Sequence, residues 1–248
     1  EARGVPTEGE RAVLQPLVDQ GLLSAEILTD EAVMAPVSGQ RQLDRKNLRR
    51  ASQLMDEAGW RVNADGMREK DGQVFTLEVL DSSPAFDRIT NPMIENMKAL
   101  GIDARLNRVD TAQESERTRA YDFDVTTHSM RMGFEPSSGL EQYFGTKAMD
   151  QSSRNLMGLS DPAVDALIEK VVRAQSKAEL NTNIRALDRV LRAKRFWIPQ
   201  WFKAVHTVAY YDQYGHPDPL PPFARGELDF WWFDAEKAAK LEAAGVLN

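Results

Sequence analysis

Cysteine is absent from this chain of 248 residues, and histidine occurs only three times. The absence of cysteine excludes thiol nucleophiles, disulfides and cysteine-based metal sites. The histidines, His128, His206 and His216, form no His-x-x-x-His pair, so a histidine-based zinc site is not expected. The sequence also lacks Gly-x-Ser-x-Gly, Gly-x-Gly-x-x-Gly and phosphate-loop motifs. We therefore expect a protein that needs no metal or cofactor.

Positive charge is in short supply as well. The chain has 31 Lys and Arg against 38 Asp and Glu, a net charge of −7. The one basic cluster, residues 41–50, has the spacing of a solvated helix face, so no nucleic-acid partner is expected. No apolar run is long enough to span a bilayer. The opening EARGVPTEGER has neither Met nor the regions of a signal peptide, and we interpret it as the start of a mature or shortened chain.

What the sequence does contain is an alternation of strand and helix patterns. A helix with its start at Asn91-Pro92 and its end at Gly101 is expected after the first strand. A polar helix, residues 111–120, is expected after the second. This order predicts an α/β unit with a crossover-connected sheet. The three strands are expected at residues 74–80, 102–109 and 123–128.

Further helices flank this unit. One is expected near residues 8–19, one between Asp44 and Gly59, and one at residues 235–244. Two turns after Gly59 indicate a short ribbon. Asp161 and Pro162 begin a helix, and another follows it. The apolar stripes of these last two helices are Val164, Leu167, Ile168, Val171 and Val172, then Leu180, Ile184, Leu187 and Leu191.

The loop Ser129–Tyr143 is the candidate ligand site. It leaves the carboxyl end of the third expected strand, which is the usual ligand side of an α/β sheet. It offers charged groups and an adaptable apolar lining, although its Met and Phe side chains could instead pack beneath the loop. The candidate ligand-binding residues are His128, Ser129, Met130, Arg131, Met132, Phe134, Glu135, Glu141 and Tyr143.

Aromatic residues crowd the C-terminal quarter, in FWIPQWFKAVHTVAYYDQYG and LDFWWFD. Such rings bury large areas, so this region forms either a rigid core or a face for something outside the chain. We expect Phe196, Ile198 and Trp201 to fill a core beside the helix that contains Leu180 and Leu191.

Several stretches resemble the C-terminal half of bacterial extracellular solute-binding proteins of family 5, the oligopeptide- and dipeptide-binding components of ABC importers. The resemblance is closest to the branch of the microcin C and peptide importers, and it covers most of residues 44–240. The stretches are LMDEAGWRVNADGMREKDG, TLEVLDSSPAFDRI, IENMKALGIDARLNRVDTAQ, YDFDVTT, NLMGLSDPAVDALIEKV, RALDRVLRAKRFWIPQW and GELDFWWFDAEKAAKL.

This resemblance implies a type II periplasmic binding protein lobe with a mixed sheet flanked by helices, lacking most of lobe I. Residues 1–43 would be an N-terminal segment packed on lobe II, 44–205 lobe II itself, and 206–248 a return toward lobe I. The implied function is non-catalytic capture of a peptide-like ligand in the periplasm. The implied partners are that ligand, ABC permease subunits and the missing lobe I.

One feature departs from the resemblance. Many peptide binders of the family hold the ligand's α-amine with an Asp in the loop after the third strand. No Asp lies between Thr126 and Met149. Glu135 could replace it, or the ligand could have a blocked N-terminus.

Other functions stay open from the sequence alone. Relatives in the family take opines, sugars or metal chelates, so the ligand need not be a peptide. A hydrolase using Glu135 or Glu141 with His128 and a protein-interaction module built on the aromatic end are two further alternatives.

Overall fold

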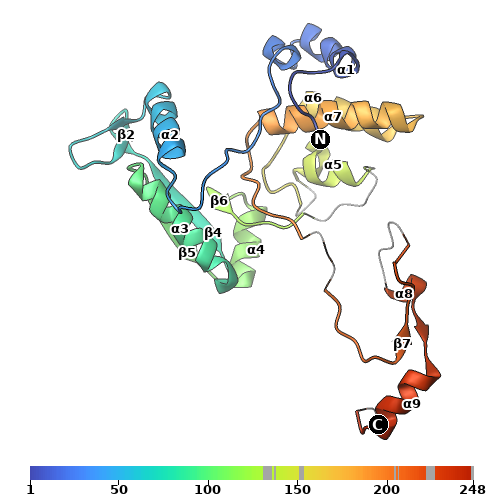
Figure 1. The fold of residues 1–248 in the computed structure, drawn as a ribbon. Helices are drawn as coiled ribbons and strands as arrows, with labels where there is room; N and C mark the ends of the chain where they lie inside the picture. The colour runs from blue at the N-terminus through green and yellow to red at the C-terminus, as the bar shows by residue number, and fades with distance from the viewer. Residues whose placement is uncertain are drawn as a thin grey trace. The chain divides into compact units, whose positions relative to one another are not determined.

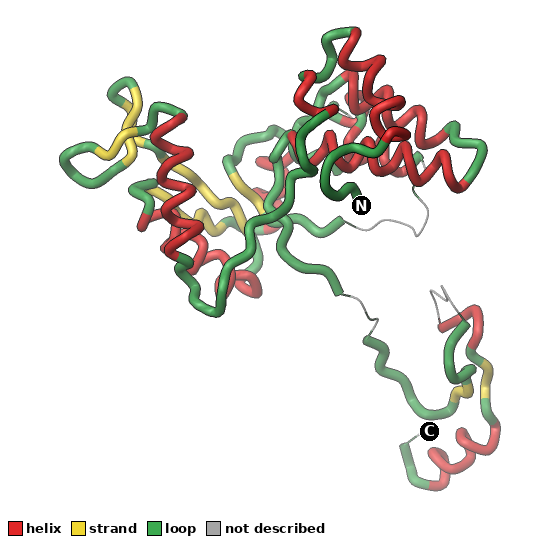
Figure 2. The backbone as a smooth tube through the Cα atoms, turned by 45° about the horizontal axis from the view of Figure 1, so that its top comes forward, coloured by secondary structure: helices red, strands yellow, loops and turns green. Residues whose placement is uncertain are grey.

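The computed structural model describes residues 1–130, 136, 138–150, 154–203, 205, 207–221 and 227–246. The chain divides into two compact units, an N-terminal unit Glu1–Ile198 and a C-terminal unit Pro199–Asn248. Figure 1 labels their helices and strands. Figure 2 shows that helices make up most of the regular structure, with the longer strands in the N-terminal unit.

A three-stranded parallel sheet forms where the sequence predicts strands. Its order is β5-β4-β6. β4 pairs with β5 along its whole length and with β6 at its carboxyl end. Because β4 is central, Val79 and Leu80 are both buried although their side chains point to opposite faces. The predicted crossover-connected α/β unit is confirmed. The bounds are β4 Thr76–Asp81, β5 Asp103–Arg108 and β6 Val125–Thr126.

The helix between β4 and β5, α3 (Asp87–Ala99), begins earlier than the sequence analysis predicts. A start at Asn91-Pro92 is wrong, because Pro92 lies inside α3. The chain is already turned upstream, where the Ser83 side chain accepts a hydrogen bond from a backbone N–H and a short 3-10 helix leads into α3. The earlier start places Thr90 one turn before Ile94, and both are buried.

One hydrophobic core lies between α3 and the sheet, which run alongside each other in Figure 1. Gly101 ends the helical segment as predicted, with φ +87°, and a Cβ there would come within 2.6 Å of the Gly66 carbonyl oxygen. α4 (Thr111–Arg119) is the expected polar helix, and the Asp110 side chain caps it. The buried members of this core are Val79, Ile94, Ile102 and Ala104.

An antiparallel ribbon stands beside the helix α2 (Arg45–Glu57), which Asp44 caps as predicted. Arg68 ties the ribbon to α2 through Asp56 at 2.7 Å and Ser52 at 2.5 Å. In the part of the chain that the structure describes, antiparallel pairing does not enter the main sheet, which is parallel rather than mixed. Helical crossovers connect its strands, and these impose parallel pairing. The ribbon strands are β1 Arg61–Val62, β2 Arg68–Lys70 and β3 Gln73–Val74.

A second hydrophobic core is helical. It joins α1 to α6 and α7, the two helices that follow the candidate loop, and the expected stripes of α6 and α7 face into it. Val172 is the exception: as the last residue of α6 it turns outward and is 51% exposed. The bounds are α1 Glu8–Asp19, α5 Gly139–Phe144, α6 Pro162–Val172 and α7 Lys177–Ala193, with 3-10 helices η1 Ala25–Leu28, η2 Pro84–Phe86 and η3 Thr146–Ala148 along the chain.

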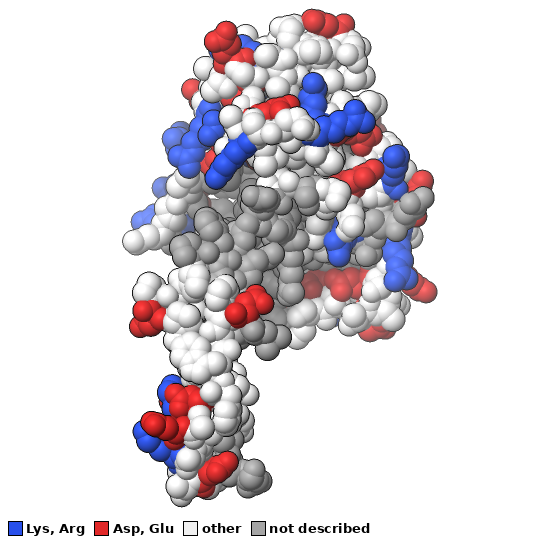
Figure 3. Space-filling model, turned by 90° about the vertical axis from the view of Figure 1, so that its right-hand side faces the viewer, with Lys and Arg blue, Asp and Glu red and all other residues white. Residues whose placement is uncertain are grey.

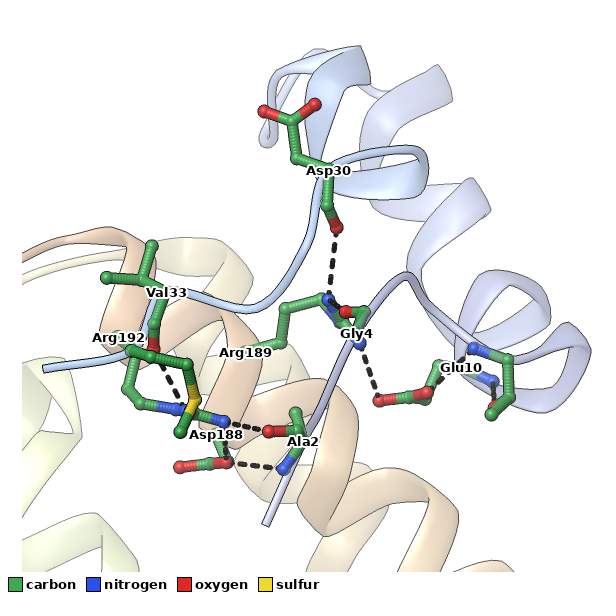
Figure 4. Close-up of polar contacts among 10 residues, drawn as sticks. Ala2, Gly4, Glu10, Asp30, Val33, Asp188, Arg189 and Arg192 are labelled. Atoms are coloured by element: carbon green, nitrogen blue, oxygen red, sulfur yellow. Dashed lines mark hydrogen bonds and ion pairs between the residues drawn. The ribbon is translucent and has the colours of Figure 1, made fainter.

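Arg189 of α7 fastens the N-terminal segment to the helical core (Figure 4). Its guanidinium donates to the carbonyl oxygens of Gly4 at 2.9 Å and Asp30 at 3.2 Å. It also forms an ion pair with Glu10 at 3.4 Å, and both side chains are 2% exposed. A buried charge is tolerated only when it is paired and hydrogen-bonded, so this contact fixes where the segment lies.

Arg192, one turn further along α7, makes a second set of contacts with the same segment (Figure 4). It donates to the carbonyl oxygens of Val33, at 2.9 Å, and Ala2. Asp188 accepts hydrogen bonds from Arg192 and from the Ala2 N–H, each at 2.7 Å. The segment on both sides of α1 is therefore held by one face of α7.

The C-terminal unit is built around Trp231. Its ring lies 4.5 Å from that of Tyr210 and 5.0 Å from that of His216, measured between centroids. A two-residue antiparallel pairing and the helix α9, capped by Asp234, complete the described part of this unit. The bounds are β7 Tyr214–Gly215, α8 Glu227–Phe230, β8 Trp232–Phe233 and α9 Ala235–Ala243.

Much of the aromatic stretch is exposed. Phe196 packs against the helical core as expected. Ile198 and Trp201 do not, since they are 64% and 58% exposed. The reason is local: α7 ends at Ala193, and the Trp197 ring, 5.7 Å from that of Phe144 between centroids, is followed by chain without helix or strand. Phe202 is exposed as well, to 85%.

Replacing Arg189 with Met should lower the free energy of unfolding by about 3–5 kcal/mol, because Glu10 would stay buried without its partner. Urea denaturation measures this change. The matched control is Arg173→Met at the C-cap of α6, which removes an exposed pair with Glu169 and should cost less than about 1 kcal/mol. Equal losses for the two variants would contradict the anchoring role.

The stability should also depend on the ionisation of Glu10. Burial acts to raise the pKa of Glu10, but hydrogen bonds from Thr7 and the charge of Arg189 outweigh it and lower the pKa below its ordinary value of 4.5. The stabilisation by Glu10 is therefore complete above pH 4.5 and is lost as the pH falls through the lowered pKa. Glu10→Gln should flatten this acid loss in urea titrations repeated at several pH values; parallel curves for both proteins would refute it.

Candidate functional site

The candidate loop starts at the carboxyl edge of the parallel sheet, where β6 ends at Thr126. His128 and Ser129 follow as exposed residues, and Met130 packs against the helical core. Partial withdrawal of the imidazole from water lowers the pKa of His128, which favours the neutral ring near neutral pH. The first part of the loop thus offers polar groups at the sheet edge, while its Met is used for packing.

The end of the loop enters α5, whose two faces differ. The Glu141 side chain is 51% exposed and lies 3.8 Å from the Lys147 ammonium. Tyr143 is only 6% exposed and belongs to the helical core, and the Arg154 guanidinium lies 5.5 Å from its ring centroid. This placement favours a packing role for Tyr143 and leaves Glu141 as an accessible carboxylate on the helix.

Arg131, Met132, Phe134 and Glu135 lie outside the residues that the structure describes. Their ligand contacts stay predictions, and so does the replacement of the missing Asp by Glu135.

Asn155, whose side chain is fully buried, holds the segment that follows α5 in the chain. Its amide donates to the carbonyl oxygens of Gly145 at 3.3 Å and Leu159 at 2.9 Å, and its oxygen accepts from the Leu159 N–H. The Tyr121 hydroxyl, from the turn before β6, donates to the carbonyl oxygens of Met149 and Asn155. These bonds connect the sheet to the return of the loop, so the two ends of the loop are held by a common framework.

The sequence analysis misses a polar cluster at the same edge. Asp81 ends β4 and Arg108 ends β5, and the two residues are partners in register. The Arg108 guanidinium lies 3.2 Å from the Asp81 carboxylate and also pairs with Asp87. Beside them the Ser82 hydroxyl donates to Glu114 at 2.5 Å. The sequence contains a signal for this cluster: β4 and β5 each end in a charged residue, and a helix-start pattern follows each of them within a few residues.

A pocket of 510 Å³ lies elsewhere, against α2, the ribbon and the C-terminal end of α3. Its lining includes Arg45, Arg49, Lys98 and Arg68. Arg68 is already engaged by Asp56, Ser52 and two backbone carbonyls, so it serves the fold. Gly101, also in the lining, precedes β5, which places this pocket at the edge of the sheet opposite to the candidate loop.

Charge on the face drawn in Figure 3 is mixed, with lysine and arginine interspersed among acidic residues. Within the described ranges, no group of three or more His, Cys, Asp or Glu side chains is placed to hold a metal ion. None of the described helices combines the length and the apolar character needed to cross a membrane.

Comparison with known proteins gives the family. The sequence profile described as "Bacterial extracellular solute-binding proteins, family 5 Middle" matches residues 15–151. The y4wM protein of Sinorhizobium fredii is 38% identical over 98% of this chain, which covers 36% of that protein. A probable peptide-binding protein, YejA, of Agrobacterium fabrum is 38% identical over 92% of the chain and is itself covered to 37%. Escherichia coli YejA is 33% identical, with 98% and 40% covered.

Solved structures share the fold. The oligopeptide-binding protein AppA of Bacillus subtilis, solved with a nonapeptide, superposes with a TM-score of 0.54 at 16% identity, over 76% of this chain and 38% of AppA. A periplasmic oligopeptide-binding protein of Thermotoga maritima gives 0.56 at 18% identity, with 79% and 41% covered.

The parallel sheet with its carboxyl-edge loop is the fold of a type II periplasmic binding protein lobe. The chain belongs to the bacterial extracellular solute-binding proteins of family 5. It spans between 36% and 40% of the length of the curated relatives named above.

Proposed function

We propose that this chain is the ligand-capturing lobe of an ABC importer's solute-binding protein, which takes oligopeptide-like ligands. The observation that carries the proposal is the position of the loop after β6, at the carboxyl edge of a parallel sheet, in a chain of this family. Ligands of open α/β sheets bind at that edge. The loop would supply one wall of a cleft, and Glu141 would supply an accessible carboxylate.

Peptide is the ligand class that the sequence relatives favour. The Agrobacterium fabrum relative, 38% identical, is named a probable peptide-binding protein. A sugar is the competing class, because a Thermotoga maritima protein of the same fold was solved with mannohexaose. The expected ligand is therefore an extended peptide-like molecule, with a sugar as the alternative outcome of the test.

The exposed rings support a second part of the proposal, which concerns the rest of the clamp. Residues 44–205 would be lobe II with residues 1–43 packed on it, and residues 206–248 would return toward a lobe I formed by other parts of the full-length protein. Trp201, Phe202 and Tyr211 are each more than half exposed, which is a large apolar surface for a single chain. We infer that lobe I covers these rings.

Closure of the two lobes would bury the ligand and present the closed form to a membrane permease in the periplasm. A single lobe should bind weakly, since burial between two walls and pre-organisation provide most of the affinity. Catalysis is not part of the proposal. Two residues of the hydrolase alternative, His128 and Glu141, lie in the described part of the loop. The family is one of solute-binding proteins, so we assign them to ligand contact and not to catalysis.

Mass spectrometry of the full-length protein, purified without denaturation, tests the function. We expect a bound peptide-like molecule of several residues. Recovery of only sugars or metal chelates would overturn the ligand class. A parallel incubation with the recovered peptide tests the hydrolase alternative: cleavage that disappears in His128→Ala would contradict a purely binding role.

Hydrogen exchange tests the proposed cover of the rings. In the full-length protein, the backbone amides near Phe202 and Tyr211 should exchange at least about tenfold more slowly than in the 248-residue chain alone, because docking would add about 1.4 kcal/mol or more of protection. The amides around Leu187 in the helical core serve as the control and should exchange alike in both. Equal exchange near Phe202 in the two proteins would refute docking by lobe I.

A further inference from the structure

Positive charge gathers at the 510 Å³ pocket against α2, at the edge of the sheet opposite to the candidate loop. Arg45 and Arg49 reach this pocket from α2, and Lys98 reaches it from α3, a helix that lies near α2 in Figure 1. Among the described residues that line the pocket, none is Asp or Glu. All charged side chains of this basic pocket therefore have the same sign, although the chain as a whole has a net charge of −7.

Three of these cations have no acidic partner in the part of the chain that the structure describes. Arg45, Arg49 and Lys98 are exposed, and within the described ranges their side chains form neither an ion pair nor a hydrogen bond. The fourth cation of the lining differs from them, because Arg68 is buried and pairs with Asp56 at 2.7 Å. The basic pocket thus holds three positive charges that the described fold does not neutralise.

The acids nearest to these cations in the sequence are engaged elsewhere. Asp44 caps α2 by accepting from two backbone N–H groups. Glu95 of α3 accepts a hydrogen bond from the Gln42 amide at 2.8 Å. Asp103, at the start of β5, pairs with Arg105 at 2.6 Å. These carboxylates have other partners, so the positive charge of the basic pocket stays available to a ligand.

Helix stability does not explain the two arginines of α2. Arg45 is the first residue of α2, where the helix dipole favours a negative charge, and the first turn contains no acidic residue. Arg45 and Arg49 are four residues apart on the same helix, so their like charges repel each other. A bound anion would relieve both unfavourable effects.

The other residues of the lining indicate what kind of anion fits. Guanidinium groups bind phosphate oxygens through pairs of parallel hydrogen bonds, and an ammonium adds a compact charge. The Ser52 hydroxyl accepts from Arg68 at 2.5 Å, so its own proton is left to donate. Leu48 and Val62 provide an apolar wall for the rest of a ligand. The volume of 510 Å³ falls within the range of about 300–1,000 Å³ that is usual for small-molecule sites.

We propose that the basic pocket is a second ligand site, which binds a phosphate monoester on a small, partly apolar molecule through Arg45, Arg49 and Lys98. Such a group carries about two negative charges at neutral pH, which suits a cluster of three cations. The pocket and the candidate loop lie at opposite edges of the sheet, so this inference does not rest on the proposed function. Soluble organic phosphates and the headgroup of phosphatidic acid share this chemistry.

Isothermal titration calorimetry of the full-length protein tests the site. The buffer has low salt, because salt screens contacts between exposed charges. The probe is phenyl phosphate, and benzyl alcohol is the control with a similar body and no charge. We expect saturable binding of phenyl phosphate alone, and weaker binding of inorganic phosphate, which makes no contact with Leu48 or Val62.

A second arm identifies the source of the phosphate group. The full-length protein is sedimented with phosphatidylcholine vesicles that contain or lack phosphatidic acid. Binding of phenyl phosphate in solution without sedimentation would assign the site to a soluble phosphate. Sedimentation with phosphatidic acid vesicles alone would assign the site to a lipid headgroup, provided that the variants below abolish it.

Variants on α2 assign the binding to the pocket. Arg49→Gln and Arg45→Gln should each weaken the binding of phenyl phosphate at least about tenfold, an effect of about 1.4 kcal/mol. The matched control is Arg50→Gln. Arg50 is the next residue of α2, pairs with Glu57 at 3.2 Å and lies outside the pocket lining, so the affinity should not change.

Urea denaturation separates ligand binding from a structural role. Arg49→Gln should be at least as stable as the parent protein, because the variant removes the repulsion from Arg45 and no ion pair among the described residues. A loss of stability in Arg49→Gln would assign Arg49 to the fold and contradict the proposal.

The remaining outcomes overturn the second site without touching the proposed function. These are equal binding of benzyl alcohol, binding of neither phenyl phosphate nor phosphatidic acid vesicles, and binding that Arg45→Gln and Arg49→Gln leave unchanged. Peptide capture at the candidate loop should be the same in all three variants, because the basic pocket lies at the other edge of the sheet.

Discussion

Parallel pairing of β4 with both of its neighbours is the constraint on which the N-terminal unit depends. Parallel strands must be connected by crossovers, so α3 and α4 have to return the chain between successive strands. The carboxyl ends of β4, β5 and β6 therefore meet at one edge. That edge collects Asp81, Arg108 and the start of the candidate loop, although these residues are far apart in the sequence. The position of the candidate ligand site follows from that arrangement.

The helical core stabilises the segments that lead into the carboxyl edge of the sheet. Leu14 of α1 and Leu187 of α7 belong to one buried cluster, and Arg189 and Arg192 hold the backbone on either side of α1. Asn155 and Tyr121 then connect the sheet to the end of the candidate loop. A lobe that closes on a ligand needs a rigid frame under its loops, because displacement of the frame would spoil the contacts that closure forms.

The two ends of the chain differ in how far their side chains are buried. A buried ion pair between Glu10 and Arg189 holds the N-terminal segment, whereas several side chains after Trp197, among them Trp201 and Phe202, are more than half exposed. Exposed rings of this number are costly in water and favourable at an interface. A clamp with two lobes would use both properties: one lobe stable by itself, and an apolar surface that the other lobe covers.

Local sequence patterns predict the strands, the helix starts at Asp44 and Asp161, the helix 8–19 and the loop after the third strand, because hydrophobic period and capping chemistry are local. They misjudged the start of α3, where an internal proline resembled a helix start, and the burial of Ile198, Trp201 and Val172. Long-range contacts place Asp81 against Arg108, leave one Asp81 oxygen without a donor among the described residues, and bury Tyr143 in the core. Strand register and burial depend on contacts between residues distant in the chain, which no local pattern encodes.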